Sequence, residues 1–131
     1  VMCSQASETV DHLLTACPFT REVWFRMLRT LGWETLAPDT QSTFLVPWWS
    51  AARKQISKDN RRCLDTLVIL TFWLLWKERN HRTFDQRVRT IDDVLTWVYN
   101  EIVAWFQAGY RSLESAVCKL GRLPGRTTGA V

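Results

Sequence analysis

Apolar and polar positions alternate with helical spacing along two well-defined segments of the chain. In the first, residues 18–31, the apolar positions lie on one face of a helix of 3.6 residues per turn. They are Val23, Trp24, Met27, Leu28 and Leu31. Pro18 is tolerated in a first helical turn, and Gly32 suits a helix end. The pattern therefore predicts an amphipathic helix over 18–31.

The second segment follows Thr90, which can cap a helix because Asp93 stands three residues later, as in a capping box. The apolar positions after Thr90 are spaced as one stripe. They are Ile91, Val94, Leu95, Val98, Ile102 and Trp105. Gly109 marks the expected end. We predict a long amphipathic helix from 90 to 109.

Residues 61–82 show a different pattern, because their middle is apolar on nearly every face. Leu67 to Trp76 is interrupted only by Thr71. A helix of this kind is expected to be buried on most faces. The polar run Lys77 to Asn80 that follows suits a helix end.

Weaker signals complete an all-α chain without internal repeats. Short or weak helices are predicted over 7–17, 44–56 and 111–120, a loop over 33–42 and a disordered tail over 121–131. With eight Trp in 131 residues, the fold class is all-α, with a short Cys/His zinc-knuckle-like N-terminus leading into a small Trp-rich helical bundle. We divide it into a truncated zinc-binding-like segment with the first helices (1–33), a helical bundle (34–110) and a C-terminal short helix with tail (111–131).

Composition narrows the class of protein. The hydrophobic fraction is 47%, and the longest apolar run is about half of the ~20 residues that a membrane span needs. No signal peptide is visible, so the chain is expected to be soluble and nuclear or cytoplasmic. The sequence has no Gly-rich phosphate loop and no nucleophile elbow. We therefore predict neither an enzyme nor a protein with a small-molecule substrate or a membrane partner.

Three residues near the N-terminus have zinc-ligand chemistry. Eight residues separate Cys3 from His12, and four separate His12 from Cys17. Thiolate and imidazole are the ligands that zinc prefers, and a structural site needs four of them. A Cys directly before Val1 would complete the set as C-x-x-C. The alternative is that Cys3 and Cys17 are ordinary thiols and that His12 is a surface residue.

Basic residues are concentrated in two clusters, and the net charge is +4. Such clusters favour a polyanionic partner, RNA or DNA, because cationic side chains displace counterions from phosphates. Trp48 and Trp49, near the first cluster, could stack on bases or pack in the core. The alternative for the charges is a solvated helical face. The candidate nucleic-acid-binding residues are Arg53, Lys54, Lys58, Arg61 and Arg62 in the first cluster, and Lys77, Arg79 and Arg82 in the second.

The segment from Cys3 to Trp24, C-S-Q-A-S-E-T-V-D-H-L-L-T-A-C-P-F-T-R-E-V-W, resembles the zinc-binding region that follows the reverse transcriptase in plant non-LTR (LINE-type) retrotransposons. That family's pattern is C-x2-C, seven or eight residues, H-x4-C, then P-F/x-x-x-x-V-W. Leu67 to Phe84, with W-L-L-W-K-E-R-N-H-R-T-F, is similar to the helical tail downstream in the same elements. The chain departs from the pattern in lacking the first Cys.

This resemblance implies a Zn²⁺-binding, nucleic-acid-associated module without polymerase activity, and a fragment or relic of an element. Cys3, His12 and Cys17 would then be metal ligands. The alternative is a metal-free helical protein–protein interaction bundle, with self-association as one form, or a non-functional remnant. An exposed patch of Trp48, Trp49 or Trp97 would favour that alternative.

Overall fold

The computed structural model describes residues 17–38, 44–85 and 88–121, and all regular structure in these ranges is helical. This confirms the all-α prediction for the described part of the chain. Residues 7–16 of the predicted first helix, residues 39–42 of the predicted loop and the tail after Gly121 lie outside the described ranges. The elements are α1 (Pro18–Thr30), the 3-10 turn η2 (Glu34–Leu36), α2 (Leu45–Lys54), α3 (Lys58–Asn80), the π-helical turn η3 (His81–Asp85), α4 (Ile91–Gln107), the 3-10 turn η4 (Arg111–Leu113) and α5 (Glu114–Leu120).

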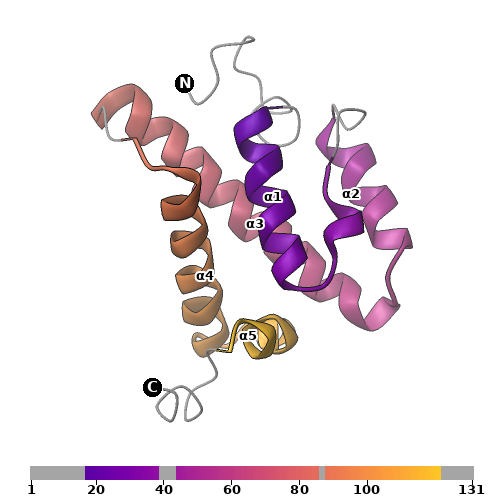
Figure 1. Ribbon diagram of the computed structural model, residues 1–131. Coiled ribbons are helices and arrows are strands. Elements are labelled where there is room, and N and C mark those ends of the chain that lie inside the picture. The colour runs from indigo at the N-terminus through magenta and orange to yellow at the C-terminus, as the bar shows by residue number, and fades with distance from the viewer. Residues whose placement is uncertain (1–16, 39–43, 86–87, 122–131) are drawn as a thin grey trace.

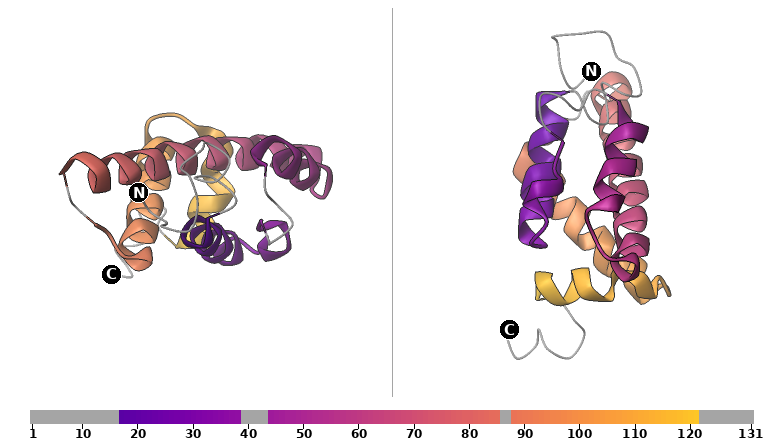
Figure 2. Two further views of the ribbon diagram at one scale, coloured as in Figure 1. Left: turned by 90° about the horizontal axis from the view of Figure 1, so that it is seen from above. Right: turned by 90° about the vertical axis from the view of Figure 1, so that its right-hand side faces the viewer.

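Helix α3 is the longest element. Helix α1 lies on one side of it, and α4 begins on that side and crosses α3 (Figures 1 and 2), so that Trp105 near the end of α4 meets Trp73. The buried face of α3 includes Leu64, Leu67, Leu70, Leu74 and Leu75, each fully buried. The opposite side carries Ile69, Trp73 and Trp76, which are 51%, 43% and 42% exposed. The expectation that α3 is buried on most faces therefore holds for the side that the other helices cover, and fails for the side that carries these three residues.

Helix α1 joins this core through the stripe that the sequence predicts. Trp24, Met27 and Leu28 are fully buried. The ring of Trp24 lies 5.0 Å from that of Trp48 of α2, and Nε1 of Trp48 donates to the carbonyl of Leu36 at 2.7 Å. An indole N–H in a core needs such a partner, so η2 is held against α2 by this bond.

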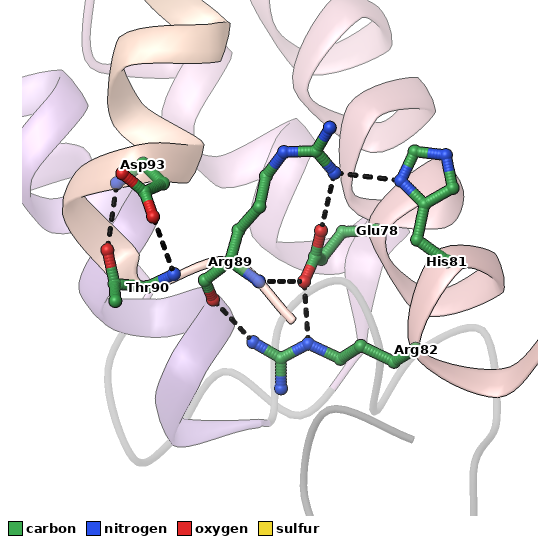
Figure 3. Close-up of polar contacts among 6 residues, drawn as sticks. All are labelled: Glu78, His81, Arg82, Arg89, Thr90 and Asp93. Atoms are coloured by element: carbon green, nitrogen blue, oxygen red, sulfur yellow. Dashed lines mark hydrogen bonds and ion pairs between the residues drawn. The ribbon is translucent and has the colours of Figure 1, made fainter. Parts of the chain in front are cut away.

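The start of α4 is the predicted capping box (Figure 3). Oγ1 of Thr90 accepts from the amide of Asp93 at 3.1 Å, and Oδ2 of Asp93 accepts from the amide of Thr90 at 3.3 Å. Both bonds satisfy amides that a helix start leaves unpaired. The buried residues of α4 are Val94, Leu95, Val98 and Ile102, whereas Ile91 and Trp105 lie at the edges of the stripe and are partly exposed.

The predicted 111–120 helix forms as η4 followed by α5. Leu113 and Val117 are fully buried and belong to the same core as α1, α3 and α4. Nζ of Lys119 also donates to the carbonyl of Leu31 at 2.7 Å. Helices from all three predicted divisions of the chain, 1–33, 34–110 and 111–131, thus contribute to one core.

Candidate nucleic-acid interface

Of the three predicted zinc ligands, Cys17 alone lies among the described residues. It is 1% exposed and stands immediately before α1, where its carbonyl accepts from Oγ1 of Thr20 at 2.9 Å. Cys3 and His12 lie outside the described ranges. Within those ranges, no group of three or more His, Cys, Asp or Glu side chains could hold a metal ion. The zinc site therefore stays a prediction.

The first basic cluster lies around the turn between α2 and α3. Arg53 and Lys54 end α2, and Lys58, Arg61 and Arg62 occupy the first turns of α3. The two helices are tied here, because Nε of Arg61 donates to the carbonyl of Arg53 at 2.7 Å. Ser50, Arg53, Lys54 and Arg61 line a hollow of about 230 Å³. Residues up to nine positions apart in sequence thus form one cationic surface.

One cation of this cluster is partly neutralised. Nε of Arg53 lies 3.2 Å from Oδ1 of Asp65, and the same oxygen accepts from Nε1 of Trp49 at 2.8 Å. Lys54, Lys58 and Arg62 are exposed. These three side chains provide positive charge that a phosphate backbone can approach.

The Trp residues beside the first cluster pack within the fold. Trp48 is 7% exposed against Trp24, so its ring cannot stack on a base in this conformation. Trp49 is partly buried and holds Asp65. For Trp48 the core-packing alternative is therefore the correct one.

The residues of the second basic cluster lie in two different environments. Nζ of Lys77 lies 4.2 Å from the ring centroid of Trp73, and the guanidinium of Arg79 lies 5.2 Å from that of Trp76. Both are cation–π contacts on the exposed side of α3. The side chain of Arg82 is only 11% exposed and pairs with Glu78 at 2.7 Å. Lys77 and Arg79 thus border an aromatic surface, while Arg82 serves an internal ion pair.

Glu78 is the centre of that ion pair and is fully buried (Figure 3). Its Oε2 accepts from Nε of Arg82 at 2.7 Å and from the backbone amide of Arg89 at 3.0 Å, and its Oε1 accepts from Nη1 of Arg89 at 3.0 Å. Arg82 also donates to the carbonyl of Arg89 at 2.8 Å. Burial alone would raise the pKa of Glu78, but these hydrogen bonds and the charge of Arg82 lower it below its ordinary value.

His81, which follows the last residue of α3, extends this cluster. Its Nδ1 lies 2.8 Å from Nη1 of Arg89, and its ring stacks on Trp97 with centroids 6.0 Å apart. Because an arginine only donates, Nδ1 of His81 is the acceptor in this hydrogen bond. This cluster was not predicted from the sequence. The signal that could have indicated it is Glu78, an acidic residue one turn after the buried Leu74.

The chain matches no protein-family model, no curated protein and no solved structure. The resemblance to the retrotransposon region therefore stays a hypothesis from residues alone.

No helix within the described ranges is long and apolar enough to cross a membrane.

Proposed function

We propose that the chain is a non-catalytic, nucleic-acid-associated module of the kind found downstream of a retrotransposon reverse transcriptase. The observation that carries the proposal is the cationic surface at the α2–α3 turn, where Lys54, Lys58 and Arg62 are exposed. Clustered lysine and arginine side chains bind phosphates without reading sequence. We therefore expect salt-dependent binding of single-stranded RNA or DNA.

The experiment is fluorescence anisotropy with a labelled single-stranded RNA at low and moderate salt. Lys54→Glu and Arg62→Glu should each weaken binding several-fold, and each should reduce the slope of log K against log[salt] by about 1. Arg61 is a poorer choice, because its side chain also holds the carbonyl of Arg53. Arg29→Glu is the matched control, since Arg29 is exposed but lies at the end of α1.

The proposal fails if the unmodified chain binds no RNA or DNA at low salt. It also fails if Arg29→Glu weakens binding as much as the cluster variants do, because net charge alone would then explain the effect.

The proposed module includes a zinc knuckle built from Cys3, His12 and Cys17. A chain extended by one Cys before Val1 should bind one Zn²⁺, which titration followed by metal analysis can measure. His12→Ala in the extended chain should reduce the affinity for zinc. If the extended chain holds no zinc, the knuckle is excluded while nucleic-acid binding by the α2–α3 surface can still stand.

A further inference from the structure

Helix α3 carries an apolar surface that no other described part of the chain covers. Ile69, Trp73 and Trp76, which we name the α3 stripe, are spaced i, i+4 and i+7, so they lie on one helical face. With Phe72 and Trp105 of α4 they line a groove of about 650 Å³. Exposed apolar surfaces of this kind mark binding sites. We propose that the groove binds an amphipathic helix of another protein, with acidic residues flanking the apolar face of that helix.

The lining of the groove favours an apolar occupant. None of its five lining residues carries a charge, and the N–H groups of its indoles are its sole polar side-chain groups. Pockets that orient small ligands add a few convergent polar groups, which this lining lacks. A partner helix instead needs a continuous apolar furrow for side chains at positions i, i+3, i+4 and i+7.

The cations beside the stripe make it a poor platform for nucleobases. Lys77 lies over one face of Trp73, and Arg79 lies over one face of Trp76. Each indole therefore has at most one face left for stacking. The other face of Trp73 is further restricted by Trp105, whose ring centroid lies 6.3 Å away with a tilt of 43°. Successive bases need successive free faces, so the geometry favours a helix over a single strand.

Charge selects an acidic partner over a second copy of this chain. Arg62 stands seven residues before Ile69 on the same face, and Lys77 and Arg79 stand at the other end of the stripe. Acidic residues also stand near these cations. Asp59 lies a turn beyond Arg62, and Glu101 lies a turn before Trp105. Asp65, a turn before Ile69, is already bound by Arg53 and Trp49. Two copies packed in parallel would place each cation against itself, and antiparallel copies would place Arg62 against Lys77 or Arg79. Like charges across an interface disfavour that partner, whereas acidic residues at both ends of a partner helix would complement the groove.

The test uses two synthetic helical peptides of about 18 residues. Both have leucines at i, i+3, i+4 and i+7, and they differ only in having Glu or Lys beside that face. Binding is followed by tryptophan fluorescence and calorimetry. The Glu-flanked peptide should bind at least about tenfold more tightly than the Lys-flanked one, and added salt should reduce the difference.

Uncharged substitutions in the lining test whether the peptide binds in the groove. Ile69→Gln and Trp76→Gln should each weaken binding of the Glu-flanked peptide about tenfold. Val46→Gln is the matched control, because Val46 is 66% exposed on α2 and is not among the residues that line the groove. It should change the affinity by less than about twofold. Circular dichroism is the check that all three variants keep their helices.

Four outcomes overturn the proposal. The Glu-flanked peptide does not bind, or the Lys-flanked peptide binds as well. The third outcome is a dimer in sedimentation experiments that Ile69→Gln dissociates, which would make a second copy the occupant. The fourth outcome is that oligouridine displaces the peptide and that Ile69→Gln weakens RNA binding, which would make nucleic acid the occupant. The last result is distinguishable from failure of the α2–α3 surface, which Lys54→Glu and Arg62→Glu test.

Discussion

Nη1 of Arg89 donates to Oε1 of Glu78 at 3.0 Å, and the backbone amide of Arg89 donates to Oε2 of the same carboxylate, also at 3.0 Å. Glu78 belongs to the last turn of α3, and Arg89 stands just before the cap of α4. One carboxylate thus holds both the side chain and the backbone of the segment that enters α4. Figure 3 shows this junction beside the capping box, so the two features together set where α4 begins.

Removing the charge of Glu78 should destabilise the fold strongly. Glu78→Gln keeps the shape of the side chain but leaves Arg82 and Arg89 without their carboxylate in a buried place. Breaking such a pair costs about 3 kcal/mol, which urea denaturation can measure. Glu22→Gln is the control, because the side chains of Glu22 and Arg26 are 42% and 37% exposed, and it should shift the unfolding midpoint much less. Equal midpoints for the two variants would contradict a stabilising role for Glu78.

The same carboxylate predicts how stability changes with acid. The pKa of Glu78 in the folded chain lies below its ordinary value of 4.5, so the folded state holds the proton less tightly than the unfolded state. Its contribution is fully present above the unfolded pKa and is lost as the pH falls through the folded pKa. The stability difference between the natural chain and Glu78→Gln should therefore be constant near neutral pH and shrink below pH 4.5. A difference that is the same at neutral and strongly acidic pH would argue against this origin.

Sequence periodicity predicted the helices because each carries its own local signals. Predicted 18–31 and 90–109 correspond to α1 and α4, and the capping box at Thr90 is present as expected. Even the weaker 44–56 prediction corresponds to α2, since Pro47 falls in the first turn, where its missing N–H does no harm.

Two features of the site depend on how helices meet, which periodicity does not encode. Glu78 looks like part of a polar helix end, yet the segment carrying Arg89 returns over it and buries it. Ile69, Trp73 and Trp76 look like core residues, yet they are 51%, 43% and 42% exposed, because the buried residues of α3 lie on its other side. The first basic cluster was predictable because its members are close in sequence.

Thr90 should contribute to stability through its cap alone. Thr90→Ala removes the acceptor for the amide of Asp93 and should cost about 1 kcal/mol, whereas Thr90→Ser keeps the hydroxyl and should cost much less. Thr96→Ala is the control, because Thr96 is exposed within α4 and Ala has the higher helix propensity. Thermal unfolding of the three variants measures the order. A Thr90→Ser variant as unstable as Thr90→Ala would show that the cap hydrogen bond is not the cause.

The packing of α5 on α3 should control the reactivity of Cys63. This thiol is 3% exposed, whereas Cys118 on α5 is exposed. Burial raises the pKa of Cys63, with smaller opposing effects from the hydrogen bond of Ser115 and the charge of Lys119. Since the thiolate is the reactive species, alkylation at mildly alkaline pH should modify Cys118 well before Cys63, and peptide mapping by mass spectrometry distinguishes them.

Loosening α5 should then accelerate modification of Cys63, even though losing the charge of Lys119 by itself raises the pKa of that thiol. Lys119→Met removes the bond to the carbonyl of Leu31 and should raise the frequency with which α5 opens locally. Glu114→Gln also changes a charge on α5, but Glu114 is exposed, and it serves as the control. If Lys119→Met leaves the rate at Cys63 unchanged while full unfolding in urea exposes it, Cys63 is reached by global unfolding, and α5 opens together with the rest of the core.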